Sequence, residues 1–390
     1  MKTKFRGNTF FVTAVLGLGL VFCACSDDKD SNASSDLNGT NIFSSLDDAI
    51  REQLPIFGVK SIVGLGNYPS SLAIDGKYGY VVDYSNNSIH RVELETYTVD
   101  ASFIDLGQNA GPYGVYADDA SIYVANQGIA EILKFDKEGK NKQTVLTQES
   151  IKAPTDVLTF RGNIVVADSE YDYANPEKTE GKIVVVTAKN EVVERKTTTQ
   201  NPAFVRIIGT GDDAFIVSLN AGVITYNEDF IQQTLPEKSC LNVWKFSDFI
   251  EVSKEPSVRT FCVPHTSLGA MAWNEDILVM GNATQAKFHT ISMKDLRSTE
   301  SSDAIIESHT LAAIDEPATI VPVVIGKSVA LFNSATDSVL WDALGEAIEF
   351  GLSKIDVKKM PIDVELDSSS NRIFVLNSAS GSLDVIDVKK

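Results

Sequence analysis

A short pattern of apolar and polar positions recurs along most of the chain. It begins at Pro69 as PSSLAIDGKYGYVVDYSNNSIHRVELE, where three apolar stretches alternate with turn residues. Short apolar stretches bounded by Gly, Asp, Asn and Ser predict β-strands. The pattern returns after Pro112, Pro154 and Pro202, near Thr266, and after Pro317 and Pro361. The chain is therefore predicted to consist of repeats with three strands in a row.

A fourth strand is predicted just before each following repeat. These segments are Ala101–Leu106, Gln143–Gln148, Glu191–Thr197, Ser257–Val263, Ala304–Leu311 and Ile348–Ser353. The last repeat has no such segment, whereas Val59–Gly66 stands before the first proline. Repeats of about 49 residues with four strands are typical of propeller blades. We therefore predict an all-β, seven-bladed β-propeller over residues 58–390, in which an N-terminal strand completes the last blade and leaves no open sheet edge.

Three segments also carry a family resemblance. Gly-Tyr-Val-Val-Asp (79–83), Ile-Tyr-Val-Ala-Asn (122–126) and Arg-Ile-Phe-Val-Leu-Asn (372–377) resemble YVTN/NHL-type propeller repeats. The resemblance covers residues 59–390 and is weakest in blades four to six. It implies the architecture rather than an activity, because such propellers serve many functions. By analogy it allows capture of a vitamin, metal complex or sugar, with an outer-membrane transporter as partner.

The N-terminus predicts export and lipidation. Lys2, Lys4 and Arg6 precede the apolar run Phe10–Phe22, which is too short to span a bilayer. Phe22-Cys23-Ala24-Cys25 then resembles a bacterial lipobox, so residues 1–24 are predicted to be a lipoprotein signal peptide and Cys25 the lipidated residue. A plain secretory signal with incidental cysteines is the alternative.

Residues 25–57 are predicted to be a tether and a short helix. Ser26–Asp30 is an acidic run that resembles surface-export signals, or is simply a solvated charge run. Leu46, Ile50 and Leu54 share one helical face before Pro55. The expected location is the outer membrane, on the cell surface, with the membrane contacted only through the lipid anchor.

The charge balance narrows the classes of partner. The 390 residues hold 34 Lys and Arg against 53 Asp and Glu, for a net charge of −19. An acidic surface repels phosphate backbones, so we expect no nucleic-acid partner. The expected partner is a small molecule or a glycan, and the expected state is a monomer.

Two long insertions predict the binding face. In a propeller, the loops between the second and third strands lie on one face, around the central channel. Ser169–Gly181 in blade three and Leu219–Cys240 in blade four are much longer than the other such loops, which is typical of a binding side. Their aromatic residues are candidate ligand contacts: Tyr171, Tyr173, Tyr226 and Phe230. The alternative is that both insertions are self-packed hairpins.

Other candidates lie near the repeat starts. Tyr68, Tyr113 and Phe204 flank repeat prolines and either line the entrance or pack between blades. His265, on the loop that opens blade five, is expected at the channel mouth. Polar residues at or near the ends of second strands either bind a cation or cap the following turn, and these are Asp83, Asn126, Asp168, Asn333 and Asn377.

The cysteines in blade four make a topological prediction. Cys240 begins the third strand and Cys262 lies near the end of the fourth, so antiparallel pairing brings them together. Exported proteins occupy oxidising compartments, which favours a disulfide over two buried thiols. Closing this loop would stabilise the protein by about 3 kcal/mol.

Sequence motifs for catalysis are missing. HExxH, CxxC and GxSxG do not occur, and the four histidines lack metal-ligand spacing. We expect no cofactor and no metal, and a binding protein that is not an enzyme. One alternative is a lactone hydrolase or lyase of the propeller type, using His265 with Asp83 or Asp168. Another is a protein-interaction platform.

Overall fold

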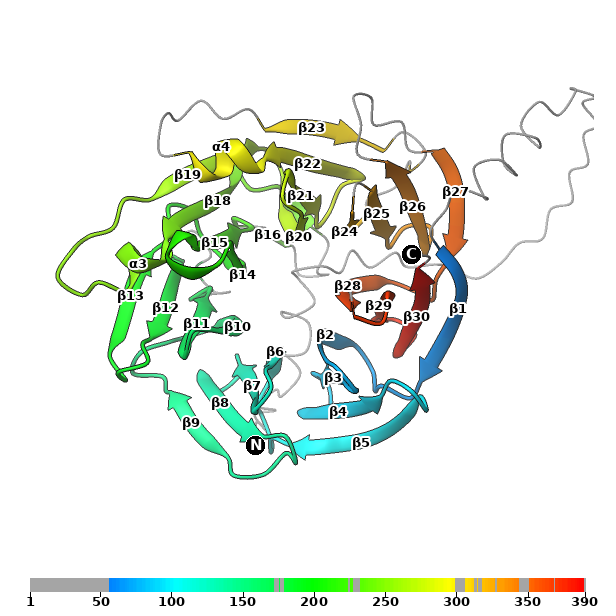
Figure 1. The fold of residues 1–390 in the computed structure, drawn as a ribbon, viewed down its shortest axis with the longest axis horizontal. Helices are drawn as coiled ribbons and strands as arrows, with labels where there is room; N and C mark the ends of the chain where they lie inside the picture. The colour runs from blue at the N-terminus through cyan, green and yellow to red at the C-terminus, as the bar shows by residue number, and fades with distance from the viewer. Residues whose placement is uncertain are drawn as a thin grey trace, which may run out of the picture.

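The computed structural model describes residues 56–388, apart from 172–174, 176–178, 224, 227–231, 299–305, 312–313, 315–317, 327, 344–350 and 368. Over these residues the chain forms seven four-stranded antiparallel sheets and one two-stranded sheet. The sheets stand around a central axis like the blades of a propeller (Figure 1). The prediction of an all-β, seven-bladed propeller is confirmed.

Each blade has the same order of strands from the axis outward (Figure 1). The innermost strands are β2 (Pro69–Asp75), β6 (Pro112–Ala117), β10 (Pro154–Phe160), β14 (Pro202–Ile208), β20 (Leu268–Trp273), β24 (Ile320–Ile325) and β28 (Pro361–Asp367). The second strands are β3 (Tyr78–Asp83), β7 (Ser121–Asn126), β11 (Asn163–Asp168), β15 (Phe215–Asn220), β21 (Ile277–Asn282), β25 (Ser328–Asn333) and β29 (Arg372–Asn377).

The outer half of each blade completes the sheet. The third strands are β4 (Ser88–Glu93), β8 (Glu131–Asp136), β12 (Lys182–Val186), β18 (Lys238–Lys245), β22 (Lys287–Ser292), β26 (Ser338–Ala343) and β30 (Ser382–Val388). The outermost strands are β5 (Thr98–Asp105), β9 (Gln143–Leu146), β13 (Val192–Lys196), β19 (Arg259–Pro264), β23 (Glu307–Thr310), β27 (Gly351–Asp356) and β1 (Ile56–Val63).

The two ends of the described chain close the ring. β1 pairs antiparallel with β30, with Ser61 opposite Asp384 and Ile62 opposite Leu383. The N–H of Leu65 continues this contact by donating to the carbonyl oxygen of Gly381 at 3.1 Å. In Figure 1 the blue β1 lies beside the red β30. The predicted closure is confirmed, although β1 begins at Ile56, earlier than the predicted Val59.

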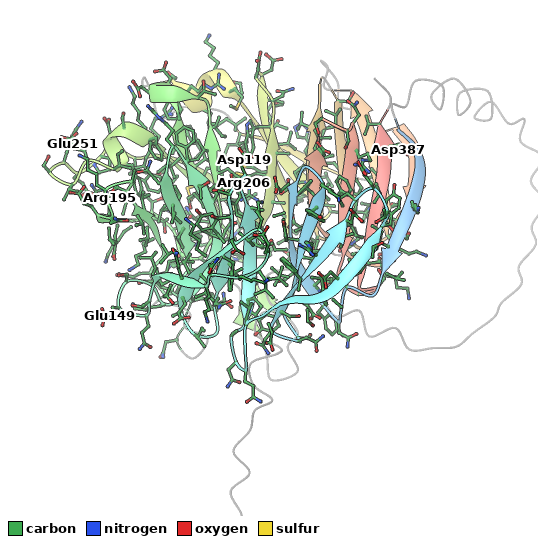
Figure 2. The ribbon with its side chains drawn as sticks, turned by 60° about the horizontal axis from the view of Figure 1, so that its bottom comes forward. Asp119, Glu149, Arg195, Arg206, Glu251 and Asp387 are labelled. Carbon is green, nitrogen blue, oxygen red and sulfur yellow. A yellow bond between two sulfur atoms is a disulfide. The ribbon has the colours of Figure 1, made fainter. Side chains whose placement is uncertain are left out.

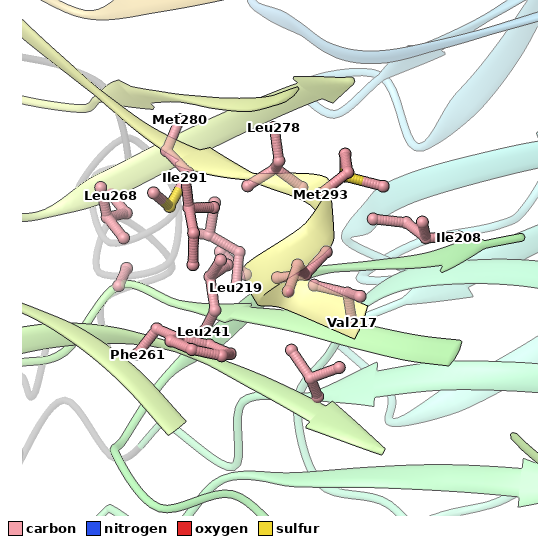
Figure 3. Packing of buried hydrophobic residues seen from close by; sticks show 14 residues of the cluster. Ile208, Val217, Leu219, Leu241, Phe261, Leu268, Leu278, Met280, Ile291 and Met293 are labelled. Atoms are coloured by element: carbon pink, nitrogen blue, oxygen red, sulfur yellow. The ribbon is translucent and has the colours of Figure 1, made fainter. Parts of the chain in front are cut away.

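The apolar core lies between the blades. Seven clusters of buried side chains each fill mainly one junction between neighbouring blades. At the junction of blades four and five, Leu219 and Leu241 pack with Leu268, Met280 and Ile291 (Figure 3). Second strands such as β7 are buried along their whole length, which explains why they are apolar runs rather than alternating ones. The closing junction is built in the same way, because Ile62 and Leu65 pack with Phe374 and Leu383.

Within the part of the chain that the structure describes, three short helices lie outside the sheets. They are η3 (Gly211–Asp213), α3 (Phe246–Phe249) and α4 (Met293–Arg297). α3 buries Phe246 and Phe249, and α4 buries Met293 and Leu296, so each helix covers apolar side chains of its own blade. None of the helices described here has the length and apolar character needed to cross a membrane.

The outer surface carries many acidic groups. Glu149, Glu251 and Asp387 are exposed on the outside of the ring (Figure 2). The surface charge therefore agrees with the acidic composition of the chain.

The predicted disulfide is confirmed. Cys240 in β18 and Cys262 in β19 are opposite each other in the register of blade four, and their sulfur atoms are bonded. The bond joins the start of the third strand to the end of the fourth. It therefore closes the base of the blade-four insertion, as the antiparallel order required.

Candidate functional site

A cavity of about 320 Å³ occupies the centre of the ring. Its walls are the innermost strands together with residues from the loops on one face, and all seven blades contribute. The loop residues include Tyr68, Ser85, Thr319 and Ser378, so the cavity reaches the face that carries the long insertions. This face is the one that the sequence predicted for binding.

Aromatic rings gather near the mouth of the cavity. Tyr68, Tyr113 and Phe204 line it, as one of the two sequence interpretations expected. Tyr84, on the turn after β3, is a fourth lining residue, and burial raises the pKa of its hydroxyl to about 12. Aromatic walls offer apolar area with few rotatable bonds, which suits a small organic ligand.

Charged side chains lie deeper in the cavity. Asp156 on β10, Arg206 on β14, and Asp363 and Glu365 on β28 are all lining residues. Asp156 and Asp363 stand two residues after their repeat prolines, whereas Arg206 and Glu365 stand four residues after theirs. Equivalent positions in different blades lie at equivalent depths along the central channel. Asp156 and Asp363 therefore lie at one depth, and Arg206 and Glu365 lie at a second depth.

Asp156 clasps blade three to blade four. One carboxylate oxygen accepts from the backbone N–H of Val157 at 2.9 Å. The other accepts from the N–H of Val205 at 3.0 Å and from Nη1 of Arg206 at 2.5 Å. Burial raises the pKa of Asp156, and the Arg206 guanidinium opposes that rise. Asp156 and Arg206 therefore form an enclosed ion pair that connects blades three and four.

Asp363 makes the same clasp between blades seven and one. Its carboxylate accepts from the N–H of Leu72 at 2.8 Å and from the N–H of Val364 at 2.9 Å. No basic side chain among the described residues pairs with it directly. Burial raises the pKa of Asp363 to about 6.

Glu365 differs from the two aspartates. Within the described part of the chain its carboxyl group has neither a hydrogen bond nor an ion pair. Burial, reinforced by the nearby negative charge of Asp363, raises the pKa of Glu365 to about 8. The side chain is surrounded by protein yet keeps partial exposure, because the lumen itself reaches it. Glu365 therefore lines the cavity without a hydrogen bond or ion pair to another described residue.

Sequence reasoning missed these four charged residues. The available signal was the occurrence of charges in the first strand of a repeat, as in PTDVL (154–158), PAFVR (202–206) and PIDVE (361–365). That strand is the innermost one, so a charge on it has to meet either the lumen or a neighbouring blade. Both Pro-x-Asp segments turned out to be inter-blade clasps.

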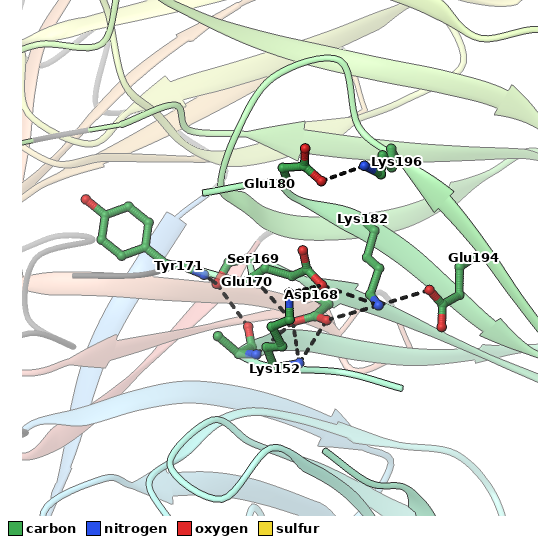
Figure 4. A network of polar contacts seen from close by, with 10 residues as sticks. Lys152, Asp168, Ser169, Glu170, Tyr171, Glu180, Lys182, Glu194 and Lys196 are labelled. Carbon is green, nitrogen blue, oxygen red and sulfur yellow. Dashed lines mark hydrogen bonds and ion pairs between the residues drawn. The ribbon is translucent and has the colours of Figure 1, made fainter. Parts of the chain in front are cut away.

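The blade-three insertion is anchored by an ion network at its base (Figure 4). Asp168 accepts from the N–H of Ala153 at 2.7 Å, and Nζ of Lys182 lies 3.4 Å from Glu170 and 3.0 Å from Glu194. Burial raises the pKa of Asp168 to about 6. The first residues of the insertion are therefore held against blade three.

The aromatic residues of the two insertions lie in segments that the structure describes only in part. Tyr171 is half-buried and is not a lining residue. Tyr226 lies in β16 (Thr225–Tyr226), which pairs with β17 (Gln232–Thr234), so this part of the blade-four insertion forms a small sheet of its own. Tyr173 and Phe230 lie outside the described residues, as do Cys25 and the predicted helix before Pro55.

His265 does not stand at the channel mouth, so that expectation was wrong. Its side chain is exposed, and its backbone N–H donates to the carbonyl oxygen of Glu237 at 2.9 Å. The reason is the direction of the loop, which runs inward from the outermost strand β19 to the innermost strand β20. His265 is the first residue of this loop and therefore stays near the rim.

Two of the polar residues at the ends of second strands cap the following turns, whereas both side-chain polar atoms of Asn126 are buried without a hydrogen-bond partner among the described residues. Asp83 accepts from the N–H of Asn86, and Asn333 accepts from the N–H of Thr336. Asp83 also lies 3.0 Å from the ring nitrogen of His90. Asp83, Asp168 and His265 do not line the cavity, so the structure does not assemble them at this site. No group of three or more His, Cys, Asp or Glu suited to a metal ion occurs among the residues that the structure describes.

Comparison with solved structures shows the propeller fold. A streptogramin B lyase aligns with a TM-score of 0.61 at 9% identity, covering 86% of this chain and 98% of that chain. Kuenenia stuttgartiensis hydrazine synthase aligns with a TM-score of 0.64 at 13% identity, covering 83% and 96%. A catalytically inactive virginiamycin B lyase from Staphylococcus aureus, solved with quinupristin, aligns with a TM-score of 0.56 at 11% identity, covering 85% and 99%.

No protein-family model matches this chain, and no curated protein matches its sequence. At these identities the solved structures establish the architecture alone. The function therefore has to be argued from the cavity.

Proposed function

We propose that this protein is a binding protein of the cell envelope that captures a small molecule or a glycan in its central cavity. The observation that carries the proposal is the cavity of about 320 Å³ with aromatic residues near its mouth and charged residues below them. Apolar walls with a few convergent polar groups are the usual composition of a ligand site. Because the walls belong to a closed ring of sheets, little ordering is needed when a ligand enters.

The binding site is tested with Phe204→Ala. A panel of monosaccharides, vitamins and nucleosides is screened by thermal shift, since a ligand that binds only the folded state raises the unfolding temperature. Loss of the aromatic ring should weaken binding of any hit by about 1–2 kcal/mol, or roughly five- to thirtyfold, in isothermal titration. Tyr97→Ala, at the outer turn between β4 and β5, is the matched control and should bind normally.

Two outcomes would contradict this site. One is the absence of any hit across the panel. The other is binding that persists in Phe204→Ala and disappears when residues 169–181 are shortened, which would place the ligand on the insertion instead.

We further propose that a lipid on Cys25 holds the propeller on the outer membrane, facing outward. Support comes from the lipobox-like segment at residues 22–25 and the polar tether that follows it. An outer-membrane transporter is the natural recipient of a captured ligand, and the propeller itself is proposed to act as a monomer.

Anchoring is tested with Cys25→Ala in bacterial cells. The wild-type protein should label with an alkyne fatty acid and sediment with membranes, and it should be degraded by protease added to intact cells. Cys25→Ala should lose the label and leave the membrane fraction, because the apolar run alone is too short to span a bilayer. Cys23→Ala is the matched control and should keep both. Equal labelling of the two variants would refute Cys25 as the lipidated residue.

A further inference from the structure

The charge of the cavity indicates the class of its ligand, an inference that rests on the proposed binding function. The lining holds three carboxyl groups, on Asp156, Asp363 and Glu365, against the guanidinium of Arg206. Nη1 of Arg206 lies 2.5 Å from a carboxylate oxygen of Asp156, and the two side chains form a salt bridge. The remaining two carboxyl groups line the lumen without a salt-bridge partner among the described residues, and Arg206 acts on them only through space.

The two remaining carboxyl groups are not equivalent. Asp363 accepts hydrogen bonds from the N–H groups of Leu72 and Val364, and the bond from Leu72 connects blade seven to blade one. Glu365 lines the same cavity without a partner among the described residues. An enclosed carboxylate without a counter-charge is costly, so a ligand that supplies a positive charge gains the most by meeting Glu365.

A metal ion is a poor match for this position. Calcium takes six to eight oxygen ligands, and magnesium requires near-octahedral geometry. The described residues contain no group of three or more side chains placed to hold a metal. A single free carboxylate suits one ammonium group, whose three or fewer N–H bonds and compact charge need far fewer protein ligands.

The aromatic lining of the cavity also favours an organic cation. Six aromatic residues line the cavity: Tyr68, Tyr84, Tyr113, Tyr116, Phe204 and Trp273. The faces of such rings attract ammonium groups, and quaternary ammonium ligands are commonly held in aromatic surroundings. An anion, in contrast, would meet two carboxyl groups that have no salt-bridge partner among the described residues, in a protein with a net charge of −19.

We infer that the ligand of the central cavity carries a cationic nitrogen, an amine or a quaternary ammonium, that pairs with Glu365 of β28 while its apolar part contacts the aromatic residues of the wall. This assigns Glu365 as the residue that selects ligands by charge. Phe204 and the tyrosines contribute area to any ligand, whereas Glu365 distinguishes a cation from a neutral molecule of the same shape.

Binding of a cation should depend on pH in a defined direction. Burial raises the pKa of Glu365 to about 8, so below that pH the empty site is protonated and a cation has to displace the proton. The charged or titratable groups recorded around it are Asp363 on the same strand, Asp156 on β10, Arg206 on β14 and Tyr116 on β6. Asp363, with a pKa raised to about 6, adds negative charge as the pH rises. Both groups therefore strengthen cation binding from about pH 6 to about pH 8.

The test uses three probes of similar size and shape that differ in charge. Choline carries a permanent positive charge, dimethylbutanol is its neutral isostere, and tert-butylacetate is the corresponding anion. Dissociation constants are measured by saturation-transfer NMR at millimolar concentrations. Choline should bind at least about tenfold more tightly than dimethylbutanol, and its affinity should rise by up to about tenfold per pH unit until about pH 8.

Glu365→Gln should abolish the preference for choline while leaving the binding of dimethylbutanol unchanged. Glutamine resembles the protonated carboxyl group that the folded protein already accommodates, so the variant is expected to fold, which thermal unfolding checks. Glu95→Gln, an exposed residue in the turn between β4 and β5, is the matched control and should behave as the wild type.

Three results would overturn the assignment. They are equal or tighter binding of dimethylbutanol or tert-butylacetate, choline binding that is unchanged in Glu365→Gln, and no saturation transfer to choline. Neutral or anionic molecules that bind in a Phe204-dependent way would refute the charge assignment and leave the proposed binding function standing. If no probe and no panel compound binds, both proposals fail.

Discussion

A protein that lacks residues 56–65 is expected not to fold. This deletion removes β1, exposes the edge of β30, and takes Ile62 and Leu65 out of the junction between blades seven and one. Burying an aliphatic side chain is worth about 1.5–3 kcal/mol, and the partner side chains on β30 and β29 lose their cover as well. The total loss is on the order of 10 kcal/mol, which is comparable to the whole stability of a typical domain.

The measurement is circular dichroism and size-exclusion chromatography of the deleted protein, with rescue in trans. A peptide covering residues 56–65 should restore the β-sheet signal, because its backbone can pair with β30 as an added strand. The same peptide with Ile62→Asp is the matched control and should fail, since residue 62 is 5% exposed in the intact protein. A deleted protein that folds alone with a wild-type unfolding midpoint would show that β1 is dispensable.

Arg206→Met is expected to destabilise the protein by about 3 kcal/mol, near the lower end for breaking an enclosed ion pair. We expect a loss near the lower end of that range because the side chain of Arg206 is 27% exposed, through the cavity. Without Arg206, the pKa of Asp156 should rise further above its usual value, because burial already raises it. The folded protein then keeps a proton that the unfolded chain releases, so the loss of stability should grow as pH increases.

Urea unfolding at acidic and mildly alkaline pH measures this effect. The double variant Asp156→Asn/Arg206→Met is the matched comparison, because asparagine still offers an oxygen to the N–H of Val205 but carries no charge. It should recover much of the stability that Arg206→Met loses, and its own stability should carry no pH dependence from residue 156, because asparagine does not titrate. Equal stability of the single and double variants, or of Arg206→Met and the wild type, would contradict the ion-pair account.

The proposals on binding depend on a feature common to propellers. Seven innermost strands surround one lumen, so a single residue from each blade can contribute to one small site. The long insertions of blades three and four lie on the same face as the mouth. The described part of the first is held against its own blade by the Lys182 network, and the described part of the second contains the β16–β17 pair, a small sheet separate from the blade. We therefore propose the cavity, rather than the insertions, as the binding site.

Prediction from sequence succeeded where the signal was repeated or local. The alternation of apolar stretches and turns was present in every repeat, so uncertain blades could be placed by their neighbours. The unmatched segment before Pro69 and the missing fourth strand at the other end implied that β1 pairs with β30. The antiparallel order of one blade was enough to bring Cys240 and Cys262 together.

Prediction of the site was less complete. How deep a residue lies in the central channel, and whether its side chain points into that channel, depend on the whole ring rather than on the neighbouring sequence. Tyr68, Tyr113 and Phe204 were identified by their position beside repeat prolines, and they line the cavity. His265 was expected at the channel mouth because its loop opens blade five, but it directly follows the outermost strand β19 and does not line the cavity. Tyr84 was overlooked because it is one of several polar or aromatic residues in short turns.

The sequence by itself determined the number of blades, the way the ring closes and the disulfide, since each follows from periodicity and strand order along the chain. Only the tertiary structure decided which charges meet in the lumen. Asp156, Arg206 and Glu365 come from blades three, four and seven, and the local sequence of one strand does not show which charges of other blades lie near it. Their interaction depends on the curvature of the whole ring, because electrostatic coupling acts through space and through the low dielectric of an enclosed cavity rather than along the chain.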